Sequence, residues 1–288
     1  MKPPSTHARP PLMTPFFYGW ILVGMAMVAG FLGAASSQLF MGIMLKPVSE
    51  EMAWSRSVTS GAITAGTLTG GFLSPITGFL VDRYGARLLM PIGAAAVSLA
   101  FLGLANLNSL VMFYVAYIAA RGLTTMCLGG VVPLTTMANW FYHKRGRAMG
   151  LVAMSLPLGG SILALAGQQI MAVGTWRTVF VVFAILMATV VIAPSAFLMR
   201  RRPEDVGLLP DGASSSTASD ASQDTRGEPA RLEYSFTLKE ALRTSTLWLL
   251  VTSMVLDTMA NGAVGFHQVA YYSDIGISPA VAAAAFAR

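Results

Sequence analysis

The chain has 288 residues, of which 55% are hydrophobic and only 11% are charged, against about 25% charged in an average soluble domain. This composition excludes an ordinary soluble protein and indicates an integral membrane protein. The formal net charge of +6 does not indicate a nucleic-acid binder, because the basic residues lie at the ends of apolar stretches and not on one face of a soluble domain. The single cysteine, Cys127, excludes a disulfide framework, and we expect it to pack as a small apolar residue.

Charged residues divide the first part of the chain into apolar stretches of about 20 residues, the length that a membrane-spanning helix needs. We expect a cytoplasmic tail over residues 1–15 and a six-helix transmembrane bundle over residues 16–202. The predicted spans lie within Phe16–Leu45, Ser57–Val81, Leu88–Leu104, Leu110–Met137, Ala148–Ala172 and a last stretch that ends at Met199. A polar loop with Lys46, Glu50, Glu51 and Arg56 should follow the first span, and Pro133 and Pro157 predict bends in the fourth and fifth.

The second part of the chain begins with residues 203–236, whose high content of Ser, Asp, Gly and Pro predicts a flexible cytoplasmic linker. Thr237 and Glu240 fit a capping box that opens a short interfacial helix. A seventh span should follow from Ser245 to Tyr272, and an eighth should begin near Pro279. Residues 237–288 would then hold the interfacial helix, helix 7 and the start of helix 8 of an incomplete C-terminal bundle, so we expect an all-α, polytopic membrane protein.

The distribution of basic residues predicts the orientation of these spans. With a cytoplasmic N-terminus, 14 of the 19 Lys and Arg residues lie on the cytoplasmic side, as the positive-inside rule requires. They are Lys2, Arg9, Arg83, Arg87, Lys144, Arg145, Arg147, Arg200, Arg201, Arg202, Arg226, Arg231, Lys239 and Arg243. We therefore expect a multi-pass protein of the cell (inner) membrane with its N-terminus in the cytoplasm.

Small residues recur every four positions along the second span. They are Ala62, Gly66, Gly70, Ser74 and Gly78. Such a ridge lets another membrane helix approach closely. We interpret it as a packing surface, with a sliding, gating interface as the alternative.

Three ionisable residues lie inside predicted spans, where each must face protein or a water-filled cavity. Arg121 in the fourth span is either a site for an anion or proton coupling, or an arginine satisfied by helix carbonyls. Asp257 in the seventh span shares a face with Asn261, and either contacts substrate or carries a proton, or anchors hydrogen bonds. His267, near the outer end of that span, is more typical of a structural residue.

The first span adds the polar run Ser36, Ser37 and Gln38, of which Gln38 is a candidate for the cavity. For enzyme chemistry the sequence offers little, since the three histidines, His7, His143 and His267, fall in separate regions and no phosphate-binding loop of the Walker type is present. We therefore expect no enzyme activity, no cofactor, no metal and no nucleic acid, and a lipid bilayer as the surroundings.

The charged island from Gly78 to Arg87 resembles the signature loop between helices 2 and 3 of the major facilitator superfamily. Two further stretches look like its bacterial monocarboxylate and oxalate/formate porter-like branch. They are Asn139-Trp140-Phe141 leading into Arg145-Gly146-Arg147-Ala148-Met149-Gly150, and Arg202-Pro203-Glu204-Asp205-Val206-Gly207-Leu208 followed by Pro210-Asp211-Gly212.

This resemblance implies a major facilitator fold with twelve spans in two halves, of which the chain would supply the first half and the start of the second. It also implies a cavity lined by helices 1, 4, 7 and 10, with the substrate site near the membrane midplane. Arg121 is similar in place to an arginine that the family associates with proton coupling. The family's gating loop maps onto Gly78, Asp82, Arg83, Gly85 and Arg87, and we expect Gly85 to end its helix in a left-handed conformation.

The resulting hypothesis is a secondary active transporter of small organic anions, monocarboxylates first among them, that works by alternating access as a proton-coupled carrier or an exchanger. The alternative is a truncated, non-transporting membrane protein of the same fold, either sensor-like or an assembly partner. The substrate, the coupling mode and the oligomeric state stay open.

Overall fold

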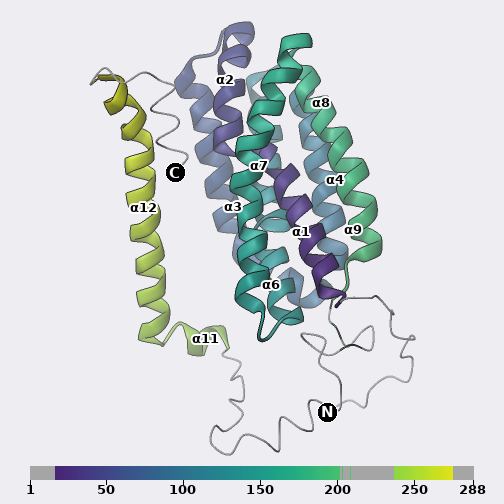
Figure 1. The fold of residues 1–288 in the computed structure, drawn as a ribbon. Helices are drawn as coiled ribbons and strands as arrows, with labels where there is room; N and C mark the ends of the chain where they lie inside the picture. Colours follow the sequence, from purple (N-terminus) through teal and green to yellow (C-terminus); the bar gives the residue numbers. More distant parts are fainter. Residues whose placement is uncertain (1–16, 202, 204–207, 209–236, 275–288) are drawn as a thin grey trace, which may run out of the picture. The chain divides into compact units, whose positions relative to one another are not determined.

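A computed structural model describes residues 17–201, 203, 208 and 237–274, and within these residues the chain is helical and has no strand (Figure 1). The predicted all-α class is thereby confirmed. The chain divides into two compact units, Met1–Gln223 and Asp224–Arg288. The predicted linker, apart from Pro203 and Leu208, and the predicted start of helix 8 lie outside the described residues.

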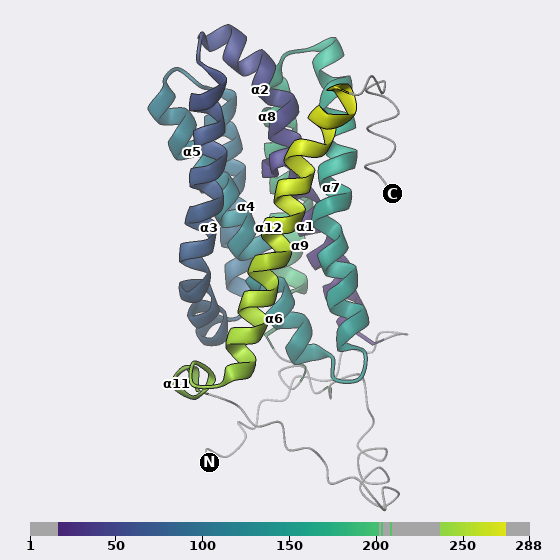
Figure 2. The same ribbon diagram turned by 90° about the vertical axis from the view of Figure 1, so that its left-hand side faces the viewer.

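The first unit is a bundle of long helices whose axes run in roughly the same direction (Figures 1 and 2). Its helices are α1 (Gly19–Gly33), α2 (Gln38–Met52), α3 (Arg56–Tyr84), α4 (Ala86–Ala105), α5 (Leu110–Leu123), α6 (Val131–Trp140), α7 (Arg145–Val173), α8 (Trp176–Leu186) and α9 (Ala193–Leu198). A 3₁₀ turn, Ala34–Ser36, joins α1 to α2. Two π-helical segments, Thr124–Leu128 and Met187–Ile192, interrupt the fourth and sixth predicted spans.

The helices pack in pairs around an apolar interior. α1 lies against α7, α3 lies against α5, and α4 contacts both α5 and α8. Aromatic rings fill part of this interior, where Phe40 of α2 lies 5.3 Å from Phe183 of α8 between ring centroids, and Phe101 of α4 lies 6.2 Å from Phe180. Burial of such large apolar side chains fixes the helices at close distance.

Five helical stretches of the described chain are long and apolar enough to cross a membrane. They are Gly19–Met44, Ala86–Ala105, Leu110–Trp140, Arg145–Val173 and Trp176–Leu198. α3 has 29 residues but is not among the five, since Gly, Ser and Thr make up much of its sequence. The apolar part of the seventh predicted span, Ser245–Ala260, is shorter. Membrane crossing by these two helices stays a prediction.

The polar loop predicted after the first span is wrong. α2 continues through Lys46, Glu50 and Glu51 to Met52, and α3 already begins at Arg56. The helix ends at Ala53, which takes the left-handed conformation with a φ of 53°. Charged residues are compatible with this helical extension, because a helix longer than the bilayer core can end in water.

The charged island that resembles the signature loop contains almost no loop. α3 extends to Tyr84 and α4 begins at Ala86, so Gly85 alone forms the turn. Its φ of 75° is positive, as expected for a glycine that ends a helix, but its ψ of 167° lies outside the left-handed helical region. This combination belongs to a region that only glycine occupies readily, and the expected left-handed helical conformation is therefore corrected.

The small-residue ridge of α3 packs against α5 over part of its length. A Cβ atom added at Gly66 would lie 3.0 Å from the Cβ atom of Arg121, and one added at Gly70 would lie 3.2 Å from that of Thr125. A Cβ atom added at Gly78 would have no neighbour within 4 Å. Ala62, the first residue of the ridge, is fully buried, so close packing extends from Ala62 to Gly70 and does not reach Gly78.

The second unit contains α11 (Leu238–Ala241) and α12 (Ser245–Asp274). The predicted capping box is confirmed, since the Thr237 hydroxyl accepts a hydrogen bond from the Glu240 backbone and the Glu240 carboxylate accepts one from the Thr237 backbone at 2.8 Å. This reciprocal pairing satisfies two backbone donors at the start of the helix.

Candidate functional site

The first membrane-crossing stretch is interrupted near its middle. After the 3₁₀ turn Ala34–Ser36, the backbone of Ser37 is extended, with a φ of −67° and a ψ of 158°. The Ser37 hydroxyl then accepts a hydrogen bond from the backbone N–H of Phe40 at 3.3 Å and caps α2. Serine suits this position because its short side chain replaces a missing intrahelical acceptor. The regular helix is therefore broken inside the apolar stretch Gly19–Met44.

The fourth predicted span is also interrupted, by the π-helical segment Thr124–Leu128. Its π-helical segment closes with a hydrogen bond from the Gly129 N–H to the Thr124 carbonyl at 3.0 Å. Gly130 follows, and a Cβ atom there would lie 2.0 Å from the Thr125 carbonyl oxygen, so no larger residue fits this backbone. Short π-helical segments occur frequently at functional sites. In contrast, α7 continues through Pro157 as one helix.

The two interruptions lie against each other. The Tyr117 hydroxyl of α5 donates a hydrogen bond at 3.1 Å to the carbonyl of Ser36 in the break of the first span. A Cβ atom added at Gly33 would lie 2.7 Å from the Thr124 methyl group. The irregular backbone of the two spans is thus held together by one buried hydrogen bond and one close apolar contact.

Arg121 follows Tyr117 by one turn of α5 and is only partly buried. Its Nε atom is buried and has no hydrogen-bond partner, and the described residues provide no hydrogen bond or ion pair to its guanidinium group. Arg145 differs, because its Nε donates to the Phe141 carbonyl at 3.2 Å and its Nη2 donates to the Ala138 carbonyl at 2.9 Å. Arg145 is an arginine satisfied by helix carbonyls, and Arg121 is not.

Two threonines follow Arg121 on the next turn. The Thr125 hydroxyl donates to the Arg121 backbone carbonyl at 3.0 Å, which satisfies it within the helix. The Thr124 hydroxyl is fully buried and has no partner among the described residues. An orphaned hydroxyl beside an orphaned guanidinium nitrogen is unusual, since buried polar groups are almost always paired.

The other residues predicted for the cavity are less concentrated. Gln38 is the first residue of α2 and is exposed. Asp257 lies in α12 of the second unit and is exposed. Asn261 and His267 are on the same helix, and their side chains lie outside the described part. Arg121 is therefore the predicted site residue whose surroundings the structure defines best.

The residues of the signature motif form a separate polar pocket of about 120 Å³, lined in part by Asp82, Thr136 and Asn139. Arg201 closes it, since its Nη2 donates a hydrogen bond to the backbone carbonyl of Asp82 near the end of α3. The same side chain lies across the turn at Gly85. Arg201 was not predicted as part of this motif, because the contact joins residues 119 positions apart.

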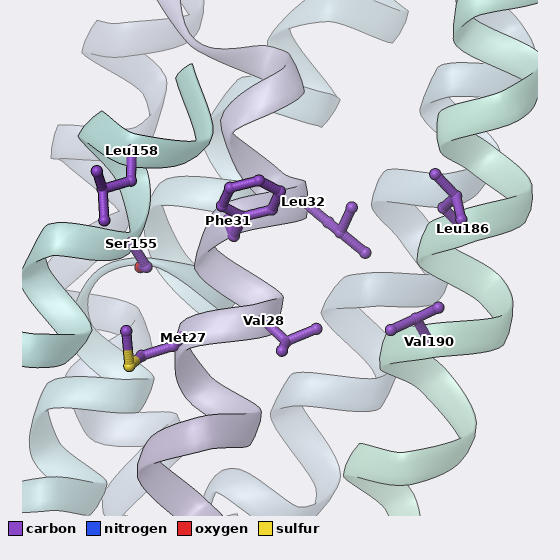
Figure 3. Close-up of a pocket in the computed structure, with 8 residues that line it drawn as sticks. All are labelled: Met27, Val28, Phe31, Leu32, Ser155, Leu158, Leu186 and Val190. Carbon is purple, nitrogen blue, oxygen red and sulfur yellow. The ribbon is translucent and has the colours of Figure 1, made fainter. Parts of the chain in front are cut away.

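A larger pocket of about 440 Å³ is lined by α1, α7, the end of α8 and the π-helical segment Met187–Ile192 (Figure 3). Apolar side chains form its wall, with Phe31 and Leu32 on α1 and Leu158 on α7. The Ser155 hydroxyl donates a hydrogen bond at 2.6 Å to the Val152 carbonyl of the same helix. None of the residues predicted from the sequence lines this pocket.

Metal chemistry has no support in the described part of the chain, where no three His, Cys, Asp or Glu side chains come together. Cys127 is buried, and a Cβ atom added at Gly93 of α4 would lie 2.3 Å from its Cβ atom. The cysteine thus packs closely against the backbone of α4, as expected for a small apolar residue.

The five long apolar helical stretches indicate a multi-pass membrane protein. The sequence profile of the Major Facilitator Superfamily matches residues 16–287, and the chain belongs to this family. Members of the family are transporters and not enzymes, which agrees with the expectation from the sequence.

Three relatives illustrate the range of similar proteins. Monocarboxylate transporter 2 of Homo sapiens is 29% identical over 205 residues, which are 68% of this chain and 41% of that protein. The uncharacterized MFS-type transporter YcxA of Bacillus subtilis (strain 168) is 25% identical, over 54% of this chain and 38% of that protein. Probable anion transporter 4, chloroplastic, of Arabidopsis thaliana is 32% identical, over 52% of this chain and 28% of that protein. The matches span less than half the length of these relatives.

Proposed function

We propose that the protein is a secondary active transporter of small organic anions, with monocarboxylates as the first candidates, and that Arg121 binds the anion. The observation that carries this proposal is the guanidinium group of Arg121, which has no hydrogen-bond or ion-pair partner among the described residues although Arg121 lies inside an apolar span. A charged group at that depth is costly unless it is compensated. A carboxylate compensates it well, because guanidinium and carboxylate groups form strong paired hydrogen bonds.

Three features support this assignment. Arg121 lies one turn after Tyr117, whose hydroxyl joins the two interrupted spans, and interrupted helices form the binding sites of many transporters. The Thr124 hydroxyl, one turn later, offers a further group that has no partner among the described residues. Two relatives are named as a monocarboxylate transporter and a probable anion transporter.

Asp257 is the proposed proton carrier, with Asn261, His267 and Gln38 as further cavity residues. This role rests on the position of an acidic residue within the apolar helix α12. We further propose that the protein lies in the cell (inner) membrane with a cytoplasmic N-terminus, as the distribution of basic residues suggests. The signature motif with Asp82 would then lie at the cytoplasmic end and contribute to gating.

Uptake measurements test these assignments. The protein, expressed at its full encoded length in cells without other carriers, should take up radiolabelled pyruvate. Replacing Arg121 by Gln should abolish this uptake without removing the protein from the membrane, and unchanged uptake would exclude Arg121 as the anion site. Replacing Asp257 by Asn should flatten the pH dependence of uptake, whereas an unaltered pH profile would exclude proton carriage by this residue.

A further inference from the structure

Gly66 of α3 lies directly against the side chain of Arg121. A Cβ atom added at Gly66 would be 3.0 Å from the Cβ atom of Arg121, 3.1 Å from its Cγ atom and 3.5 Å from the Cε1 atom of Tyr117. Carbon atoms in optimal contact are about 3.5 to 4.0 Å apart. A Cβ atom at position 66 would therefore press on the first two carbons of the Arg121 side chain, which would have to shift by a few tenths of an ångström.

This contact acts at the base of the arginine side chain and not at its flexible end. Rotation about the first two side-chain bonds decides where a guanidinium group points, and staggered rotamers leave few choices. The Cβ and Cγ atoms of Arg121 face Gly66 of α3, and the Nε atom further along the side chain is buried. The direction of the guanidinium group therefore depends on the absence of a side chain at position 66.

We propose that Gly66 is a positioning residue for the anion site: its missing side chain sets the depth and the direction of the Arg121 guanidinium group. This inference rests on the proposed function of Arg121. It predicts that an added methyl group at position 66 weakens anion binding without removing the charge, since bidentate pairing depends on the orientation of the planar guanidinium group.

The same helix offers matched controls. Gly70 lies one turn further on the same ridge, and the three atoms nearest to a Cβ atom there would all belong to Thr125, at 3.2 to 3.4 Å. Gly71 of the same helix has open space, since a Cβ atom there would meet nothing within 4 Å. The three alanine variants therefore make the same chemical change on one helix, with contact to Arg121, contact to Thr125 of the π-helical segment, and no contact.

The experiment compares Gly66→Ala, Gly70→Ala and Gly71→Ala in the protein of full encoded length, purified and reconstituted into liposomes. Initial rates of radiolabelled pyruvate uptake give KM and the maximal rate, and the thermal midpoint reports folding. Gly66→Ala should raise KM about tenfold, equivalent to about 1.4 kcal/mol, with a maximal rate within about twofold of wild type. The two controls should leave KM within about twofold.

An equal KM for Gly66→Ala and Gly70→Ala would overturn the proposal, and so would a Gly66→Ala protein that fails to fold while Gly70→Ala folds, because Gly66 would then serve packing alone. Arg121→Gln in parallel separates the two levels of the argument. Unimpaired uptake by Arg121→Gln rejects the proposed function itself. If Arg121→Gln abolishes uptake and the glycine variants have the same KM, only the role of Gly66 is rejected.

Discussion

The Tyr117 hydroxyl donates a hydrogen bond at 3.1 Å to the backbone carbonyl of Ser36, and this bond joins the interrupted first span to the interrupted fourth span. Ser36 belongs to the 3₁₀ turn that separates α1 from α2, so its carbonyl is no part of a continuous helix. Within hydrocarbon, backbone groups released from a helix need a partner. Tyr117 supplies it one turn before Arg121.

Replacing Tyr117 by Phe should therefore lower the thermal midpoint and raise the KM for pyruvate. The Ser36 carbonyl would lose a partner in a buried place, which costs about 1–3 kcal/mol. Tyr114→Phe is the control, since the Tyr114 hydroxyl donates at 2.7 Å to the Val58 carbonyl near the start of α3. Unfolding followed in detergent should show destabilisation by both variants, and uptake should show a changed KM only for Tyr117→Phe. Unchanged values for Tyr117→Phe would contradict the role of this bond.

Gly159 allows the closest approach of α7 to α1. A Cβ atom there would lie 2.4 Å from the Phe31 carbonyl oxygen and 2.9 Å from the Phe31 Cα atom, and backbone atoms cannot rotate away. Gly159→Ala should therefore destabilise the protein by about 1–3 kcal/mol, measured as a lower thermal midpoint. Gly150→Ala on the same helix meets nothing within 4 Å and should leave the midpoint nearly unchanged. Equal midpoints for both variants would show that α1 and α7 do not approach so closely.

Gly85 carries a backbone conformation that other residues rarely adopt, with a φ of 75° and a ψ of 167°. Gly85→Ala should cost about 1–3 kcal/mol of stability through strain and through contact with the Arg201 side chain, whose Cγ atom would lie 2.9 Å away. Adding Arg201→Gly removes the whole side chain, including the Cβ atom at 3.1 Å, but not the strain, so the double variant should recover only part of the loss in thermal midpoint. Complete recovery would show that the turn itself is unstrained.

Glu51 pairs with Arg177 at the opposite end of the bundle from the Gly85 turn. Its carboxylate also accepts a 2.5 Å hydrogen bond from the Trp176 indole, and these contacts, the one from Arg177 first, lower the pKa of Glu51 below its ordinary value of 4.5. A lowered pKa contributes stability that is present above the ordinary value and is lost as the pH falls through the folded-state pKa. The thermal midpoint of the wild-type protein should therefore decrease when the pH is lowered below about 4.5.

Glu51→Gln is the matching variant, because it keeps the size of the side chain and removes the charge. Its midpoint should be lower than that of wild type at pH 7, and the difference should shrink as the pH falls below about 4.5. Glu51 is exposed and Arg177 is half-buried, and added salt should reduce the difference at neutral pH. A constant difference across this pH range would exclude Glu51 as the titrating group.

Much of the helical frame was predictable from the sequence. Apolar length and charge placement gave the sequence positions of the helices, and Ser109 and Thr237 mark helix starts at which their side chains accept backbone hydrogen bonds. The extension of α2 through Glu50 and Glu51 was not predictable by the same reasoning, because charge marks the end of an apolar stretch and not the end of a helix.

The site was predictable only in part. Arg121 stood out as a charge inside an apolar span, and Tyr117 could have been found from its helical spacing of four residues. The break at Ser37 and the π-helical segment at Thr124 were not foreseen, since hydropathy does not report backbone irregularity. Whether an arginine is satisfied by its own helix depends on the backbone around it, which separates Arg121 from Arg145 only in three dimensions.

The central claim is that the Arg121 guanidinium group is the anion-binding group of the protein. Equilibrium binding of radiolabelled pyruvate to purified protein of full encoded length tests it without requiring transport, with Arg145→Gln as the control for loss of a positive charge. Wild type and Arg145→Gln should bind pyruvate saturably, and Arg121→Gln should weaken binding at least about tenfold, which corresponds to about 1.4 kcal/mol. Equal affinity of Arg121→Gln and wild type would contradict the claim.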